Sequence, residues 1–389
     1  MANRIRKEIE AILADENLQN DLKILPQNYT FEVPKTIWKI RETKAQLVAL
    51  QFPEGLLMYS CLIADILSKY TSCETIIMGD VTYGACCVDD YSARSLGCDL
   101  LVHYGHSCLV PIQDTAGISM LYIFVNIDLN LSHFIEIAQI HLSNHGTLAL
   151  VSTIQFVASL QVLKRELCEK GINVIIPQCS PLSPGEILGC TSPKLSEDVG
   201  AIVYVGDGRF HLESIMIQNP QIPAFQYNPY SRKLTKESYG FELMVQNRSK
   251  AIEAAKNASC FGLIQGTIGR QGNPRIFDDL EEKLIARDKT FIRVLLSEIF
   301  ANKLALFKGV DCWAQVACPR LSIDWGLSFP TPLLTPYELS CALDFTKFTL
   351  DDYPMDFYAY DSRGPWTNNN EKHRPRRIHR PRVAVGSAT

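Results

Sequence analysis

Between residues 46 and 340, short apolar runs alternate with longer stretches of helical periodicity, and this alternation constrains the fold more than any other feature of the chain. Such alternation is typical of βαβ units, in which helices cover a mainly parallel sheet. Three blocks can be marked, with opening strands expected at residues 46–50, 147–151 and 261–264. Their similar size and element order indicate a triplicated α/β unit, although three unrelated α/β pieces would give the same spacing.

The block boundaries give a domain plan. We predict an N-terminal helical extension, three α/β domains and a C-terminal tail, with a long helix over residues 236–258 as the bridge from the second domain to the third. The tail is rich in basic residues and proline, so we expect disorder from about residue 367. The predicted segments are 1–45 (extension), 46–145, 146–257 and 258–345 (α/β domains) and 346–389 (tail).

The charge balance limits the binding partners. The 389 residues carry a net charge of −4, which excludes a generally basic surface of the kind that binds nucleic acid. Six basic residues stand against one acid between Glu371 and Arg382. That run could contact RNA or a ribosome-associated partner, but a solvated tail accounts for it as well, and we expect no direct nucleic-acid binding.

The N-terminus gives no sign of a targeting segment. Ile5, Ile9 and Ile12 recur at helical spacing among charged residues, which predicts an amphipathic helix rather than a signal peptide. Nowhere do about 18 apolar residues follow one another, as a membrane span requires. We therefore expect a soluble cytoplasmic protein with no membrane contact, in a compartment that keeps its 13 cysteines reduced.

Three of the cysteines follow predicted strands, one in each block. They are Cys86, Cys190 and Cys318. Ligands of open parallel sheets bind outside the carboxyl ends of the strands, so these loops are where a site is expected. The chain has no CxxC motif, which argues against a zinc ribbon. A site assembled in space from three thiolates would suit a 4Fe-4S cluster with one open iron, although three inert cysteines near solvent would show the same pattern.

The remaining cysteines are mostly expected in the core. Cys61, Cys168 and Cys341 fall on apolar faces of predicted helices, and buried free cysteine is common. Cys87 is expected to point away from any site that Cys86 enters. Cys108 follows a predicted strand, and His103 and His106 precede it in the sequence, so these three side chains could form a mixed ligand set or an acid–base site.

Several longer stretches resemble a known family. They are GDVTYGACCVDDYSARSLGCDLLVHYGHSCLVP, QFPEGLLMYS, YVGDGRFHLES, VACPRLSIDWG and YPMDFYAYDSRGPW. On these motifs the chain resembles the first-subunit family of eukaryotic 2-(3-amino-3-carboxypropyl)histidine synthase, which begins diphthamide synthesis on elongation factor 2. The resemblance extends from Leu25 to Trp366.

The resemblance implies three α/β domains around a pseudo-threefold centre that holds a 4Fe-4S cluster, with one cysteine from each domain. Matched motif by motif, the cysteine of YGAC is Cys86, that of LGCTSP is Cys190 and that of ACPRLS is Cys318. These are the same three cysteines that the strand positions single out.

By the same resemblance, S-adenosylmethionine is the cosubstrate, and an electron from the reduced cluster breaks its Cγ–S bond. A 3-amino-3-carboxypropyl group then adds to C2 of a histidine of elongation factor 2, and methylthioadenosine is released. The resemblance also implies a heterodimer with a paralogous second subunit, and a small iron-binding protein as the electron donor.

Contacts to the cosubstrate are assigned on chemistry rather than on the family. Two glycine-containing loops follow predicted strands and could direct backbone N–H groups or a fixed cation at an anionic group, although either could be a simple turn. The first lacks the third glycine of a dinucleotide fingerprint, so NAD binding is not supported. The candidates are Asp207 and Gly208 in the first loop and Gln265, Gly266, Thr267 and Arg270 in the second.

Two other functions stay open at this point. The chain could be a non-catalytic subunit of the same heterodimer, a scaffold whose cluster only relays electrons. It could also be an enzyme of the quinolinate synthase type, in which the open iron of a 4Fe-4S cluster acts as a Lewis acid. A requirement for S-adenosylmethionine would separate the radical enzyme from the Lewis-acid enzyme.

Overall fold

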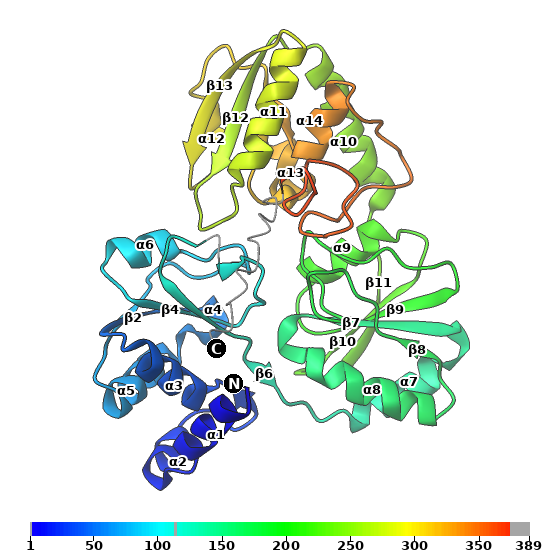
Figure 1. The fold of residues 1–389 in the computed structure, drawn as a ribbon. Helices are drawn as coiled ribbons and strands as arrows, with labels where there is room; N and C mark the ends of the chain where they lie inside the picture. The colour runs from blue at the N-terminus through cyan, green and yellow to red at the C-terminus, as the bar shows by residue number, and fades with distance from the viewer. Residues whose placement is uncertain (1, 113–114, 374–389) are drawn as a thin grey trace, which may run out of the picture.

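Three α/β units, each built on its own sheet, lie at the corners of a triangle in the computed structural model, which describes residues 2–112 and 115–373 (Figure 1). Their central strands are apolar runs buried on both faces, such as the run Leu47–Gln51, because helices cover both sides of a parallel sheet. All neighbouring strands within each sheet are parallel except for one antiparallel edge pair in the second. The predicted fold class is therefore confirmed.

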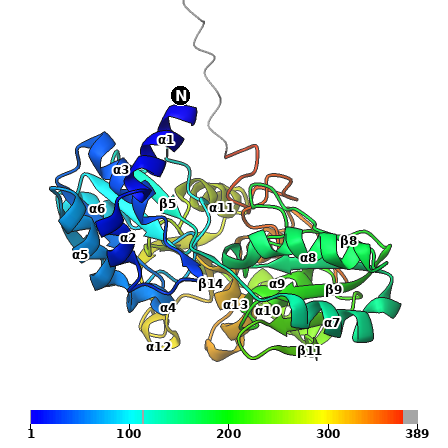
Figure 2. The ribbon, with the colours of Figure 1, turned by 90° about the horizontal axis from the view of Figure 1, so that it is seen from below.

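The first unit, coloured blue to cyan in Figure 1, contains a four-stranded sheet in the order β3-β2-β4-β5. The N-terminal helices α1 to α3 lie together on this unit (Figure 2), and α3 contributes to its core. Its strands are β2 (Leu47–Gln51), β3 (Glu74–Ile77), β4 (Leu100–Tyr104) and β5 (Ser119–Ile123). Its helices are α1 (Ala2–Leu13), α2 (Glu16–Leu22), α3 (Val33–Thr43), α4 (Glu54–Leu57), α5 (Ser60–Tyr70) and α6 (Asp90–Ser95).

The second unit, in green, has the order β8-β7-β9-β10-β11. A short antiparallel ribbon of β1 (Tyr29–Thr30) and β6 (Asn126–Ile127) lies where the chain leaves the first unit. The strands are β7 (Thr147–Ser152), β8 (Val174–Ile175), β9 (Val199–Val205), β10 (Ala224–Asn228) and β11 (Lys233–Glu237). The helices are α7 (Ser132–His141), α8 (Val157–Glu169) and α9 (Phe210–Gln218), with 3₁₀ turns η2 (Ser143–His145) and η3 (Ile154–Phe156).

The third unit, yellow to orange, has the order β13-β12-β14-β15. Its strands are β12 (Cys260–Gly266), β13 (Thr290–Leu296), β14 (Cys312–Val316) and β15 (Leu333–Leu334). Its helices are α10 (Phe241–Lys256), α11 (Pro274–Ala286), α12 (Ala301–Leu304), α13 (Pro319–Trp325) and α14 (Pro336–Ala342), with the 3₁₀ turn η4 (Gly326–Ser328).

All three sheets share one topology. When the strands are numbered in chain order within each unit, the order across each sheet begins with the second strand, followed by the first, third and fourth. The second strand therefore lies on one side of the first strand and the third strand on the other side, which makes a switch point between the first and third strands. Loops at such a switch point form a crevice in which ligands bind. The helix before each first strand, namely α3, α7 or α10, packs into the core of the unit that follows it. The predicted boundaries 145/146 and 257/258 therefore separate α7 and α10 from the units against which they pack.

Two stretches differ from the sequence-based expectation. The helix expected over residues 236–258 begins only at Phe241, because residues 233–237 form β11, which pairs antiparallel with β10. The tail expected to be disordered from about residue 367 is ordered as far as the structure describes it. Thr367 and His373 are buried, and Trp366 belongs to the core of the third unit. Residues 374–389 lie outside the described residues.

The segment 346–373 is part of the folded protein. In Figure 1 it is the red-orange loop region where the third unit meets the second. Its apolar side chains, among them Tyr353, Met355 and Phe357, are buried in the core cluster of the third unit. Within the described residues, no helix is long and apolar enough to cross a bilayer.

Candidate metal centre

Cys86 lies in the loop between β3 and α6. The Cys87 N–H donates to the Gly84 carbonyl at 2.9 Å, which closes a turn around Cys86. Gln51, the last residue of β2, donates from its side-chain amide to the Cys87 carbonyl at 2.8 Å, and this contact is buried. The first cysteine is therefore presented by a turn that is tied to a central strand of its own sheet.

Cys190 lies in the long connection between β8 and β9. Isolated β-bridges pair Thr191 with Leu188 and with Asp356 of the C-terminal segment. The Thr191 hydroxyl oxygen lies 3.7 Å from the Cys190 sulfur, and the Phe357 N–H donates to the Cys190 carbonyl at 3.2 Å. The C-terminal segment thus holds the second cysteine along its backbone.

Cys318 stands at the junction of β14 and α13, where it is the N-cap residue of the helix. Pro319 occupies the first helical turn, which favours a helix start at this point. Gln315 on β14 donates to the Cys318 carbonyl at 2.9 Å. Burial raises the pKa of the Cys318 thiol, and the backbone N–H groups of Arg320 and Leu321 partly offset that rise.

The three thiols, one from each unit, lie close enough for their charges to interact. Burial raises the pKa of Cys190 to about 12, and a charge on Cys318 adds to the rise. The pKa of Cys86 is raised well above its ordinary value by a hydrogen bond with Cys87, by burial, and by charges on Cys87, Cys190 and Cys318. Thiols buried together resist ionisation because like charges repel in a poorly solvated place. A soft metal group bound among them would relieve that repulsion.

Arg320 joins the third unit to the second at this centre. Its guanidinium donates to the carbonyl of Gly189, the residue before Cys190, at 3.2 Å and to the Phe210 carbonyl at 2.7 Å. It also pairs with Glu213, and it lies 4.6 Å above the Phe210 ring. A Cβ at Gly189 would lie 2.0 Å from that ring, so only glycine permits this approach. Sequence reasoning missed Arg320 because its partners are backbone carbonyls distant in sequence.

Tyr358 is a second residue that sequence reasoning missed. Its pKa is raised well above the ordinary value by burial, by charges on Cys86 and Cys190, and by a hydrogen bond with Cys86. Its backbone N–H donates to the Thr191 hydroxyl at 3.0 Å. The residue lies in the motif YPMDFYAYDSRGPW, but no periodicity or strand position marked it as part of a site.

The second glycine-containing loop, after β12, lies against two of the three cysteines. Gly266 packs on Ala317, the residue before Cys318, where a Cβ would meet the Ala317 Cβ at 2.6 Å. The Arg270 N–H donates to the Cys86 carbonyl at 2.8 Å. The Gln265 side chain donates to Gly272 at 3.3 Å, and the Thr267 N–H donates to Leu296 at 2.9 Å.

The Arg270 guanidinium is engaged within the protein, because it forms an ion pair with Asp90. The other loop candidates, Asp207 and Gly208, are exposed, and their carbonyls accept hydrogen bonds from Tyr204 and Gln226. The assignment of these loop residues to the cosubstrate stays a prediction.

The other cysteines range from buried through half-buried to exposed. Cys341 is buried as expected, but the expectation of a core position is wrong for Cys61 and Cys168, which are exposed. The buried faces of their helices are formed by residues such as Ile63 and Leu167, and the two cysteines point away from them. All 13 cysteines are free.

Cys87 was expected to point away from the site that Cys86 enters, but its thiol contacts the Cys86 thiol. The two thiols share a hydrogen bond, which lowers the pKa of Cys87 to about 7 against the effect of burial. The Gln271 side chain also donates to the Cys87 sulfur at 3.5 Å. Both cysteines belong to the turn that the hydrogen bond from the Cys87 N–H to the Gly84 carbonyl closes.

The mixed site expected from Cys108, His103 and His106 does not form. Cys108 is exposed, whereas His103 is fully buried and its Nδ1 lies 2.9 Å from the Gln51 Oε1. In the part of the chain that the structure describes, no three Cys, His, Asp or Glu side chains are placed to hold a single metal ion.

Comparisons with known proteins agree on one family. The model of the family described as "Putative diphthamide synthesis protein" matches residues 52–354. A Caenorhabditis elegans protein named 2-(3-amino-3-carboxypropyl)histidine synthase subunit 1 is 62% identical over 99% of this chain and 98% of its own length. The Homo sapiens protein of the same name is 53% identical over 100% of this chain and 89% of its own.

Solved structures match the fold. The crystal structure of Dph2 from Pyrococcus horikoshii with a 4Fe-4S cluster has a TM-score of 0.69 and 23% sequence identity, and the match covers 83% of this chain and 93% of that one. A second structure of Dph2 from the same organism gives a TM-score of 0.68. At this identity the likeness establishes the common fold of three α/β units.

Proposed function

Since the chain belongs to the diphthamide synthesis family, we propose that it is the catalytic subunit of the first step of diphthamide biosynthesis. It is a transferase, because its relatives are named 2-(3-amino-3-carboxypropyl)histidine synthase subunit 1, and the same name makes it a subunit of a larger assembly. The observation that carries the catalytic assignment is the convergence of Cys86, Cys190 and Cys318, one from each unit. A scaffold without a cluster would not need three such thiols at one centre, whereas a subunit whose cluster only relays electrons would need them and is separated by the assay.

A 4Fe-4S cluster fits this centre. Soft thiolates select such clusters, and three cysteine ligands leave one iron open to substrate. The homologous fold of Pyrococcus horikoshii Dph2 holds a 4Fe-4S cluster. The proposed ligands are Cys86, Cys190 and Cys318.

The proposed reaction uses S-adenosylmethionine. When bound, the cluster would supply the electron that cleaves the Cγ–S bond of this cosubstrate. The 3-amino-3-carboxypropyl group is transferred to C2 of a histidine of elongation factor 2, and methylthioadenosine leaves. We assign Gln265 and Gly266, at the end of β12, Thr267, at the start of the loop that follows, and Asp207 and Gly208 to contacts with the cosubstrate.

The chain's own residues position the site and keep water from it. Arg320 fixes the second unit against the third beside Cys190, and the C-terminal segment covers the second cysteine. Tyr358 brings a hydroxyl to the Cys86 sulfur from that same segment. A buried, preorganised site of this kind holds reactants in a fixed geometry and protects a reactive intermediate from solvent.

The partners follow from the same proposal. They are a paralogous second subunit in a heterodimer, a small iron-binding electron donor, and elongation factor 2 as the protein substrate. The reaction would take place in the cytoplasm, where elongation factor 2 works and where the 13 free cysteines would stay reduced.

The test is an anaerobic assay of the chain with its partner subunit, dithionite, S-adenosylmethionine and unmodified elongation factor 2. We expect methylthioadenosine to form in step with modification of the factor. Cys86→Ala, Cys190→Ala and Cys318→Ala should each abolish both products, while the exposed control Cys61→Ala should keep them.

Two results would contradict the proposal. If methylthioadenosine does not form, the radical reaction is excluded and a Lewis-acid role becomes the better account. If the three cysteine variants keep full activity beside an intact partner, this chain is a scaffold or electron relay.

A further inference from the structure

The ion pair between Arg270 and Asp90 lies within the molecule and joins two units. Asp90 begins α6, four residues after Cys86, and its side chain is fully buried. Arg270 belongs to the loop after β12 in the third unit, and its side chain is 19% exposed. The pair therefore ties the third unit to the segment that carries the first cysteine.

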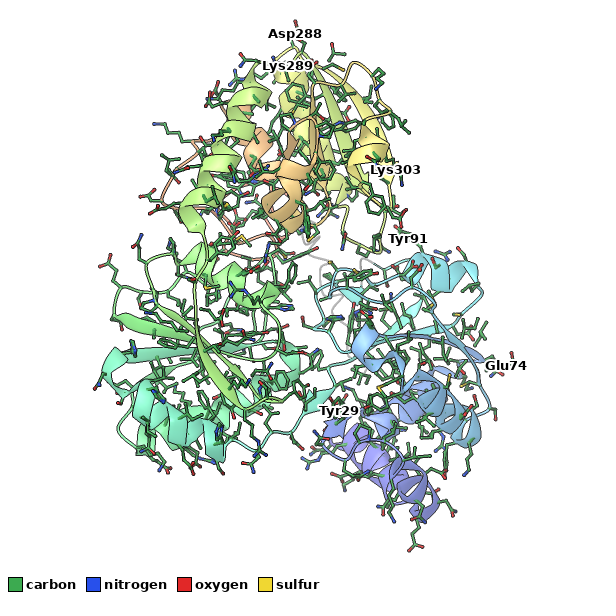
Figure 3. All side chains as sticks on the ribbon, turned by 180° about the vertical axis from the view of Figure 1, so that it is seen from behind. Tyr29, Glu74, Tyr91, Asp288, Lys289 and Lys303 are labelled. Carbon is green, nitrogen blue, oxygen red and sulfur yellow. The ribbon has the colours of Figure 1, made fainter. Side chains whose placement is uncertain are left out.

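The geometry of the pair is bidentate. The Arg270 Nε donates to one carboxylate oxygen of Asp90 at 2.8 Å, and Nη2 donates to the other. The Nη1 group donates to the Tyr91 hydroxyl at 3.0 Å, and the guanidinium lies 4.1 Å from the centre of the Tyr91 ring. Figure 3 shows Tyr91 at the boundary between the first and third units. A planar fork held at this many points fixes orientation as well as distance.

The backbone of the same loop contacts the cysteines directly. The Arg270 N–H donates to the Cys86 carbonyl, and the Gln271 amide donates to the Cys87 sulfur. Gly269 has a φ of +50°, and a Cβ there would lie 2.5 Å from the carbonyl carbon of Cys87. The loop approaches the Cys86–Cys87 peptide so closely that only a glycine fits at that point.

From the sequence, Arg270 was a candidate cation for binding the cosubstrate. In the structure, the Arg270 guanidinium donates to Asp90 and Tyr91. We propose that Arg270 is a positioning residue, and that its pairing with Asp90 holds the Cys86 thiol in place relative to Cys190 and Cys318. This inference rests on the proposed function for the role of the three thiols. The contacts between the two units stand without it.

The first test measures thiol reactivity in the full-length chain freed of metal. Each of Cys86, Cys190 and Cys318 is alkylated with a maleimide, and mass spectrometry follows its rate. In Arg270→Gln we expect the rate at Cys86 to rise at least about tenfold, because losing a bidentate charged pair favours local opening of the loop by a factor of that order. The rates at Cys190 and Cys318 should stay within about twofold of the wild-type values.

The matched control is Arg293→Gln. Arg293 is also an arginine of the third unit paired with a carboxylate, Glu281, but its side chain is 64% exposed and the pair joins parts of one unit. It should leave all three alkylation rates unchanged. Arg270→Lys keeps the charge and loses the fork, so its Cys86 rate should fall between those of the wild type and Arg270→Gln.

The second test measures cluster retention in the reconstituted chain. We expect iron to pass to a chelator several-fold faster from Arg270→Gln and from Asp90→Asn than from the wild type or Arg293→Gln. If the wild type binds no iron, the proposed function fails while the alkylation rates still decide the positioning role. Equal acceleration at all three cysteines, no acceleration at Cys86, or the same acceleration in Arg293→Gln would each overturn the inference.

Discussion

The first two units and the third present their cysteines in different ways. In the first and second units the cysteine lies on a long loop after the second strand, β3 or β8. In the third unit it follows the third strand, β14, at once and caps a helix. The three units share one strand order, so this difference lies in the loops and not in the topology.

The difference teaches how the centre is held together. A cysteine between a strand and a helix is fixed by both elements, whereas a cysteine on a long loop needs support from elsewhere. That support comes largely from the third unit and the segment after it. Arg270 reaches the Cys86 loop, Arg320 reaches the residue before Cys190, and Phe357 pairs with Cys190 itself. The third unit is therefore the reference against which the two loops are placed.

Of the changes considered, removal of the C-terminal segment 346–373 should lower the stability of the protein most. A chain ended after Phe345 loses four buried aromatic side chains, those of Tyr353, Phe357, Tyr358 and Trp366. We expect more than about 5 kcal/mol of stability to be lost, since each buried aromatic contributes about 2 kcal/mol. Urea unfolding measures it. A chain ended after His373 is the control, and equal stability of the two would show that the segment does not support the centre.

Removing the link between the third and second units should have the next largest effect. Arg320→Gln leaves Asp324 without its cation and Glu213 with only the partly exposed Arg209, and the Arg320 side chain is only 3% exposed. We expect a loss of about 3 kcal/mol in the free energy of unfolding. Arg363→Gln is the comparison, because its pair with Asp352 is about one-third exposed and should cost under about 1 kcal/mol. Similar costs for the two variants would contradict a special role for Arg320.

His103 contacts Gln51, which in turn holds the Cys86 loop, and the free energy of unfolding should depend on pH through this histidine. Burial, and then the charge of nearby His106, hold the pKa of His103 well below its ordinary value of 6.5. The unfolded chain therefore binds a proton at His103 as the pH falls below 6.5, while the folded chain does not, and stability is lost in that range. The slope for one such group is at most about 1.4 kcal/mol per pH unit.

Chemical unfolding at pH 7 and pH 5 measures this loss. His103→Gln removes the titrating group and keeps a side chain that can hydrogen-bond to Gln51, so its stability should change less between the two pH values. An identical change in the variant and the wild type would show that His103 does not titrate on unfolding.

The smallest effect is expected away from the centre. Cys61→Ser changes an exposed side chain on α5 and should alter stability by no more than about 0.5 kcal/mol. Cys341→Ser places a hydroxyl in the core of the third unit and should cost about 1–3 kcal/mol. Thermal unfolding of the two variants side by side would separate exposed from buried cysteine, and equal melting temperatures would contradict the placement.

Much of the fold could be predicted, because parallel strands buried on both faces leave apolar runs in the sequence. The run Leu47–Gln51 is an example, and the opening strands expected at residues 46–50, 147–151 and 261–264 correspond to β2, β7 and β12. β11 was missed because its residues, KLTKE, lie at an exposed sheet edge and carry no apolar run. Tertiary contacts rather than local pattern decide such an edge strand.

Candidate site residues could be predicted only where strand positions marked them, and the assignment of the three cysteines as ligands stays a prediction. Cys86, Cys190 and Cys318 each follow a strand, so the position of the loops pointed to them. Arg320 and Tyr358 could not be found, since what places them at the centre is contact with residues more than a hundred positions away. Cys61 was placed in the core because it neighbours apolar residues, but helix rotation puts it on the exposed face.

The most direct test of the account is the iron content of the anaerobically reconstituted chain and its cysteine variants. We expect about four iron and four sulfide ions per chain. We also expect Cys86→Ala, Cys190→Ala and Cys318→Ala each to lose the bound iron while Cys61→Ala retains it. Full iron retention in all three variants, or loss of iron from Cys61→Ala, would contradict the claim that each unit contributes one thiol to a common centre.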